Sequence, residues 1–69
     1  MNELIAEIES MEREGAVVLL KWDGERGDFR RTVVISRADT DYLFRKDSED
    51  IQGALREGIG DYREVHPLK

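Results

Sequence analysis

The chain lacks cysteine entirely and has a single proline and a single histidine among its 69 residues. Without cysteine, neither a disulfide framework nor a thiolate zinc site can stabilise the fold. A domain of this size buries only about 60% of the surface that its unfolded chain would expose. Its stability must therefore come from the packing of a small core or from association with a partner.

Long apolar segments are also missing. No stretch approaches the roughly 20 apolar residues that a membrane-spanning helix requires. The first residues, Met-Asn-Glu-Leu-Ile-Ala-Glu, lack the basic start of a signal peptide. Together with the lack of cysteine, these features favour a soluble cytoplasmic protein that does not interact with a membrane.

The net charge of −5 is unevenly distributed. Residues 1–15 sum to −4 and residues 47–69 to −3, whereas residues 16–46 sum to +2. The two ends of the chain are therefore acidic and the middle is mildly basic. An overall acidic balance disfavours nonspecific attraction to nucleic acid or anionic lipid.

The middle of the chain predicts a sheet. Thr32-Val-Val-Ile35 is the densest β-branched run, and such residues favour a half-buried pleated surface. An apolar run, residues 16–22, precedes it, and Tyr42-Leu-Phe44 follows a turn rich in aspartate. We therefore expect a three-stranded antiparallel meander with the strand through Thr32 and Ile35 at its centre.

A helix is predicted on each side of this sheet. Apolar residues follow helical spacing near the start of the chain, where Gly15 is placed to end the helix, and again after residue 50. Asp47 or Ser48 is the expected N-cap of the second helix. The fold class is thus α+β, a small α-β-β-β-α domain over residues 1–65, with both helices on one face of the sheet and residues 66–69 as a loose tail.

Alternation along the strands divides their side chains between two faces. Trp22 shares its face with Val18 and Leu20, and we expect it to pack beneath the helices together with Ile8 and Leu55. Further residues assigned to this covered face are Phe29, Val33, Ile35, Tyr42 and Phe44. The opposite face then exposes a group of aliphatic residues surrounded by basic ones, an arrangement common at interaction sites.

No residue pattern indicates catalysis. His66 stands beside Pro67 in the expected tail without nearby ligands, and the serines lack a local base or a nucleophile-elbow context. The loop Asp23-Gly-Glu-Arg-Gly-Asp28 has neither the EF-hand spacing nor the Walker lysine–hydroxyl pair. We expect a protein that is not an enzyme, with no catalytic residue, cofactor or metal.

The main functional hypothesis is an interaction or regulatory module that acts through the open face of its sheet. It would bind another protein or form a homodimer, because small domains often gain stability through association. The candidate interface comprises Val17, Leu19, Lys21, Arg30, Thr32, Val34, Leu43 and Arg45.

The alternative hypothesis is nucleic-acid binding, because the order α-β-β-β-α and the length resemble those of double-stranded-RNA-binding domains. That resemblance implies recognition through the first helix, the first hairpin loop and a basic start of the second helix. Here that start is Lys46-Asp-Ser-Glu-Asp50, and the first helix is acidic, so phosphate would be repelled. The main positive density lies at Arg26, Arg30, Arg31, Arg37, Arg45 and Lys46.

Overall fold

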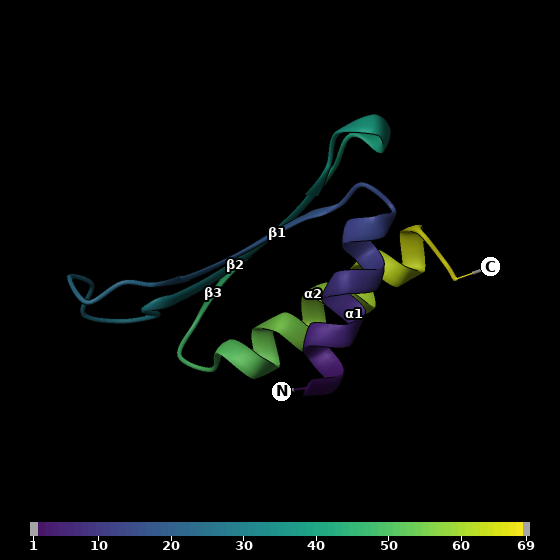
Figure 1. The fold of residues 1–69 in the computed structure, drawn as a ribbon. Helices are drawn as coiled ribbons and strands as arrows, with labels where there is room; N and C mark the ends of the chain where they lie inside the picture. Colours follow the sequence, from purple (N-terminus) through teal and green to yellow (C-terminus); the bar gives the residue numbers. More distant parts are fainter. Residues whose placement is uncertain (1, 69) are drawn as a thin grey trace.

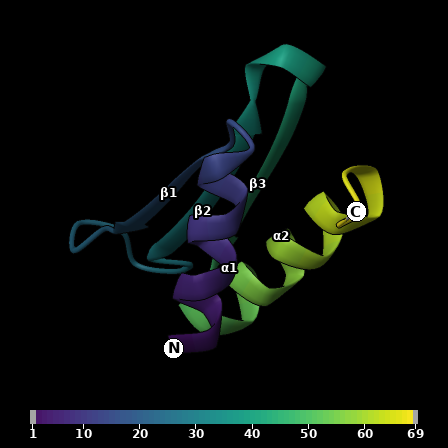
Figure 2. The same cartoon turned by 45° about the vertical axis from the view of Figure 1, so that its right-hand side comes forward.

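The structure is a computed structural model that describes residues 2–68. Its elements follow the order α1 (Asn2–Arg13), β1 (Val17–Trp22), β2 (Arg31–Arg37), the short 3-10 helix η1 (Ala38–Thr40), β3 (Tyr42–Ser48) and α2 (Ile51–Val65). The strands form one antiparallel sheet in the order β1-β2-β3. Both helices lie on the same side of this sheet (Figures 1 and 2), so the predicted α+β fold is confirmed.

The ends of the two helices follow ordinary capping chemistry. Gly15 has a φ of 101°, a left-handed conformation that glycine adopts without strain, and it follows α1 as the sequence predicted. The N-cap of α2 is Asp50, whose carboxylate accepts a hydrogen bond from the Gly53 amide at 3.1 Å. The expected cap at Asp47 or Ser48 was wrong, because both residues belong to β3 and pair with β2.

The core lies between the helices and the covered face of the sheet. Its buried residues come from every layer and are Leu4, Met11, Ala16, Val33, Ile35, Ala54, Leu55, Ile59 and Tyr62. Helix α2 approaches the sheet closely at Gly58, where an added methyl group would lie 2.8 Å from a Phe44 ring carbon and 2.9 Å from Ile35 Cδ1. The missing side chain at Gly58 therefore sets the distance between α2 and the sheet.

Two aromatic residues predicted to lie in the core are exposed. Trp22 is on the covered side of β1, but its side chain is 58% exposed. Its cross-strand neighbour Arg31, and Ser48 beyond it, are polar residues, and the β1–β2 end of the sheet projects past the helices (Figure 1). Phe29 precedes β2, has a left-handed φ of 50° and is 55% exposed. Tyr62, fully buried, is the largest core side chain instead.

Within residues 2–68, neither helix is long and apolar enough to cross a bilayer.

Candidate interaction surface

The side of the sheet that faces away from the helices presents nine side chains, which we call the open face. The strand register arranges them in three rows that run across β1, β2 and β3. These rows are Val17–Ser36–Leu43, Leu19–Val34–Arg45 and Lys21–Thr32–Asp47. The open face therefore has one end that is largely aliphatic and one that is charged.

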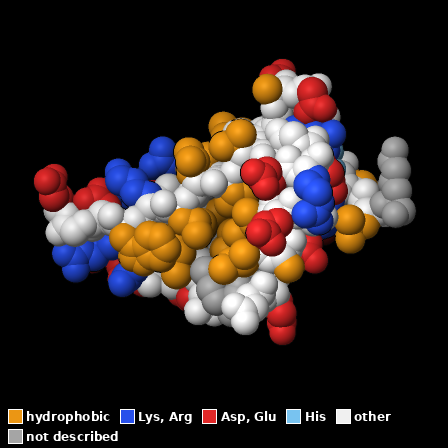
Figure 3. Space-filling model, in the orientation of Figure 1, with side chains coloured by type: hydrophobic (Ala, Val, Ile, Leu, Met, Phe, Trp, Pro, Cys, Tyr) orange, Lys and Arg blue, Asp and Glu red, His pale blue; other side chains and the backbone are white. Residues whose placement is uncertain are grey.

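The aliphatic end is exposed to solvent. Leu43 is 70% exposed, Leu19 58% and Val17 53%, whereas Val33 and Ile35 on the covered face are fully buried. Val34 is half-buried between its neighbours on the two edge strands. In Figure 3 a group of hydrophobic side chains lies along the upper outline above β1, on the side away from the helices. Among the described residues, no helix or loop covers this group.

The charged side chains at the other end of the open face are paired with oppositely charged residues of the same chain. Asp47 accepts a hydrogen bond from the Thr32 hydroxyl at 2.6 Å and pairs with Arg26 at 3.3 Å and Arg45 at 3.6 Å. The Thr32 hydrogen bond, together with these two guanidinium groups, lowers the pKa of Asp47 below its ordinary value. Lys21 pairs with Asp23 at 3.5 Å.

Most of the residues predicted for the interface lie on the open face, with two qualifications. Thr32 points to this face but is only 6% exposed, beneath the ion pairs around Asp47, so it offers almost no contact surface. Arg30 precedes β2 and folds back on the hairpin loop, where its Nη2 donates to the carbonyl of Gly24 at 2.9 Å. Val17, Leu19, Lys21, Val34, Leu43 and Arg45 form the accessible surface.

The basic residues of the nucleic-acid hypothesis do not form a group free of acids. Apart from the Arg26 and Arg45 pairs with Asp47, Arg31 lies 3.7 Å from Glu49. Lys46 lies 2.7 Å from Glu57, and Arg37 contacts Asp39 at 2.8 Å. A phosphate backbone would have to compete with these carboxylates for the same cations.

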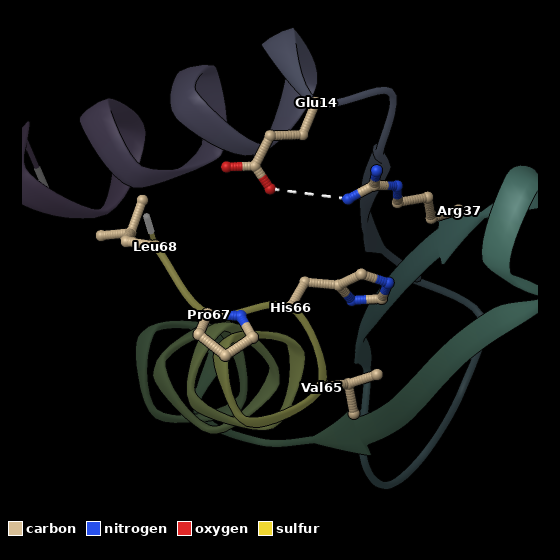
Figure 4. Close-up of a pocket in the computed structure, with 6 residues that line it drawn as sticks. All are labelled: Glu14, Arg37, Val65, His66, Pro67 and Leu68. Carbon is tan, nitrogen blue, oxygen red and sulfur yellow. Dashed lines mark ion pairs between the residues drawn. The ribbon is translucent and has the colours of Figure 1, made fainter.

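A polar cluster that the sequence did not indicate joins the ends of α1, β2 and α2. We call it the Glu14 cluster, after the carboxylate at its centre. That carboxylate accepts hydrogen bonds from the Tyr62 hydroxyl at 2.9 Å and from Arg63 Nη1 at 2.9 and 3.0 Å. Arg37 donates to the Tyr62 hydroxyl at 3.0 Å and lies 3.7 Å from Glu14 (Figure 4). The hydrogen bond from Arg63 is the main cause of a lowered pKa of Glu14.

His66 belongs to the same region and is not a solvated tail residue. Its ring stacks on Tyr62 with centroids 4.5 Å apart, and its Nε2 lies 2.8 Å from the Thr40 hydroxyl. Tyr42 meets both rings edge-on at 5.4 Å. Burial raises the pKa of both tyrosines, and the neighbouring Asp61 carboxylate raises the pKa of Tyr42 further. The four-residue spacing of Tyr62 and His66 is the sequence signal that could have indicated this contact.

A pocket of about 620 Å³ opens beside the Glu14 cluster, lined by Glu14, Arg37, Val65, His66, Pro67 and Leu68 (Figure 4). Its volume would suit a small molecule. Its charged groups, however, are already engaged: Glu14 by Arg63 and Tyr62, and Arg37 by Asp39 and Tyr62. Across residues 2–68, no three acidic or histidine side chains gather as a metal site would require. The cluster therefore connects three elements of the fold, and its charged groups are not free to bind a ligand.

Comparison of the chain with protein-family models, with curated proteins and with solved structures gives no match. The function must therefore be argued from the surfaces described above.

Proposed function

We propose that the protein is a small interaction module that binds a second copy of itself through the open face of its sheet. The observation behind this proposal is the exposure of Val17, Leu19 and Leu43 on one sheet face that no described element covers. Contiguous apolar surface bordered by charge is typical of protein interaction sites. A domain this short also has more to gain from association than a larger one.

The charge distribution favours a second copy over a strongly charged partner. The ionic side chains on or paired at the open face are Lys21, Arg26 and Arg45 against Asp23 and Asp47, which gives three minus two, or +1. The whole chain has a net charge of −5, so most of its negative charge lies elsewhere. Two nearly neutral open faces can approach each other with little repulsion, and both helices of each copy stay on the outside.

The size of the face sets the expected strength of association. Three strands spaced about 4.8 Å apart, with six residues of about 3.4 Å each, give a face of about 300 Å² in projection. Two such faces cover about 600 Å² in projection, which is less than the roughly 1,000 Å² of a stable specific interface, so the association must be weak and transient. Since buried area does not fix an affinity, the association must be measured over a range that extends to high protein concentration.

Sedimentation equilibrium from low micromolar to about 1 mM tests the proposal. The parent chain should show a rising fraction of dimer, and Leu43→Ser should reduce that fraction at every concentration. Leu68→Ser is the matched control, because Leu68 is a similarly exposed leucine (64%) that lies outside the open face. A parent chain that remains monomeric at 1 mM would rule out the homodimer, as would equal effects of the two substitutions.

We also propose that the module is not an enzyme, because Glu14 and Arg37, the carboxylate and guanidinium groups beside the pocket, are engaged with neighbouring side chains. Nucleic-acid binding is less well supported, since within residues 2–68 five of its six candidate cations are paired with carboxylates, Arg30 being the exception. A salt titration against short RNA and DNA duplexes separates the two hypotheses. Affinity should be absent even at low salt, where the phosphate contribution is greatest.

A further inference from the structure

The three rows of the open face also specify how two copies would meet. We infer, on the basis of the proposed self-association, that the dimer has a two-fold axis parallel to β2, so that β1 of each copy lies over β3 of the other. The inference rests on the strand register, which places an aliphatic residue at both ends of one row and opposite charges at the two ends of another.

Two face-to-face arrangements with two-fold symmetry keep the strands of the two sheets aligned. If the axis lies in the interface at right angles to the strands, the row order reverses. The row Val17–Ser36–Leu43 then faces the partner's Lys21 and Asp47. This arrangement removes water from the paired charges and leaves Val17 and Leu43 without an apolar partner, which is costly.

An axis parallel to β2 keeps each row opposite itself. Val17 then faces the partner's Leu43, and Leu43 faces the partner's Val17, so that four exposed aliphatic side chains meet. In the charged row, Lys21 faces the partner's Asp47. In the middle row, Leu19 faces the aliphatic stem of the partner's Arg45. Strand directions in the two sheets remain aligned, as is usual in packed sheets.

The axis itself passes close to the central strand. Val34 and Ser36 of β2 therefore each face the same residue of the partner, whereas residues of β1 never do, because β1 faces β3. This distinction can be tested by cross-linking. The chain has no cysteine, so every introduced thiol is unique.

The experiment uses single-cysteine variants at high protein concentration and a short bis-maleimide cross-linker. Ser36→Cys alone should give a covalent dimer. Val17→Cys and Leu43→Cys should each give little dimer alone, but an equimolar mixture should give several-fold more. Glu64→Cys, on the exposed side of α2, is the control for random collision and should give only background in every combination.

Other patterns would overturn the arrangement while leaving self-association intact. Strong cross-linking of Leu19→Cys with itself, without cross-linking of Ser36→Cys, would indicate the perpendicular axis or pairing of two β1 edges. Strong cross-linking of Leu43→Cys with itself would indicate pairing of two β3 edges. If instead the unmodified chain sediments as a monomer at 1 mM, the proposed function fails, and this arrangement fails with it.

Discussion

Glu14 and Arg63 are 49 residues apart in the sequence, and Arg63 Nη1 donates to both oxygens of the Glu14 carboxylate at 3.0 and 2.9 Å. Glu14 follows the last turn of α1, and Arg63 lies in the last turn of α2. The Tyr62 hydroxyl donates to the same carboxylate and accepts from Arg37 at the end of β2. One carboxylate thus connects three elements in a chain that has no disulfide to do so.

Replacing this carboxylate should make the free energy of unfolding depend less on pH between pH 7 and pH 2.5. The pKa of Glu14 is lowered from 4.5 in the folded protein, chiefly by Arg63, so its contribution is present above about pH 4.5 and is lost as the pH falls through the lowered value. Glu14→Gln should cost about 1–2 kcal/mol at pH 7, since hydrogen bonds to charged groups are stronger than neutral ones. Urea unfolding at pH 7 should show this loss, and at pH 2.5 the difference from the parent should become much smaller.

Glu12→Gln provides the control for that experiment, because Glu12 is an exposed carboxylate two residues earlier, in the last turn of α1. It should change stability by less than about 0.5 kcal/mol, as is usual for exposed substitutions. A stability difference between Glu14→Gln and the parent that stays constant from pH 7 to pH 2.5 would contradict the assigned role of the ionised carboxylate.

The sequence predicted the elements and their order because both depend on local periodicity. The apolar run of residues 16–22 and the β-branched run of residues 32–35 identified strands, and helical spacing identified α1 and α2. The cap of α2 was misplaced because Asp47, Ser48 and Asp50 are all chemically suitable. Pairing of Asp47 with Thr32 in the sheet decides between them, and that pairing is a tertiary contact.

The sequence predicted the open face better than it predicted the Glu14 cluster. Strand parity alone indicated that Val17, Leu19 and Leu43 share a face, whereas the burial of Thr32 depends on ion pairs that only the folded hairpins bring together. The Glu14 cluster was missed because its hydrogen bonds connect residues as far apart as Glu14 and Arg63. Whether the open face binds a partner stays a prediction.

Alanine substitutions at two glycines of α2 test how closely this helix packs against the sheet. Gly58→Ala would place a methyl group within 3 Å of Phe44 and Ile35, and the displacement should cost about 1–3 kcal/mol. Gly60→Ala, two residues later in the same helix, meets nothing within 4 Å and should stabilise the protein by about 0.5–1 kcal/mol. Thermal unfolding followed by circular dichroism should move the melting temperature in opposite directions. Two shifts of the same sign would contradict this packing.

Trp22 should matter little to stability despite its size. Its side chain is 58% exposed at an end of the sheet that the helices do not cover. Trp22→Ala should therefore cost less than about 1.5 kcal/mol, whereas Leu55→Ala in the core should cost about 2–5 kcal/mol. Fluorescence of the parent gives an independent check, because an exposed indole emits at long wavelength and is readily quenched by acrylamide. A blue-shifted emission that resists quenching would show that the indole is buried.

Val34→Thr should weaken association of the domain without unfolding it. Val34 is half-buried at the centre of the open face, and the substitution keeps the β-branched shape that favours a strand while adding a hydroxyl. The variant should remain folded, with a loss below about 1.5 kcal/mol, because the new hydroxyl can reach solvent in the monomer. In a dimer of the variant the substituted residue would face its own copy in the partner, so two hydroxyl groups would replace an apolar contact and lose their water, with at most one hydrogen bond between them, which is costly. Sedimentation equilibrium should therefore show several-fold weaker association at an unchanged far-ultraviolet spectrum. Association as strong as that of the parent would place the interface elsewhere on the molecule.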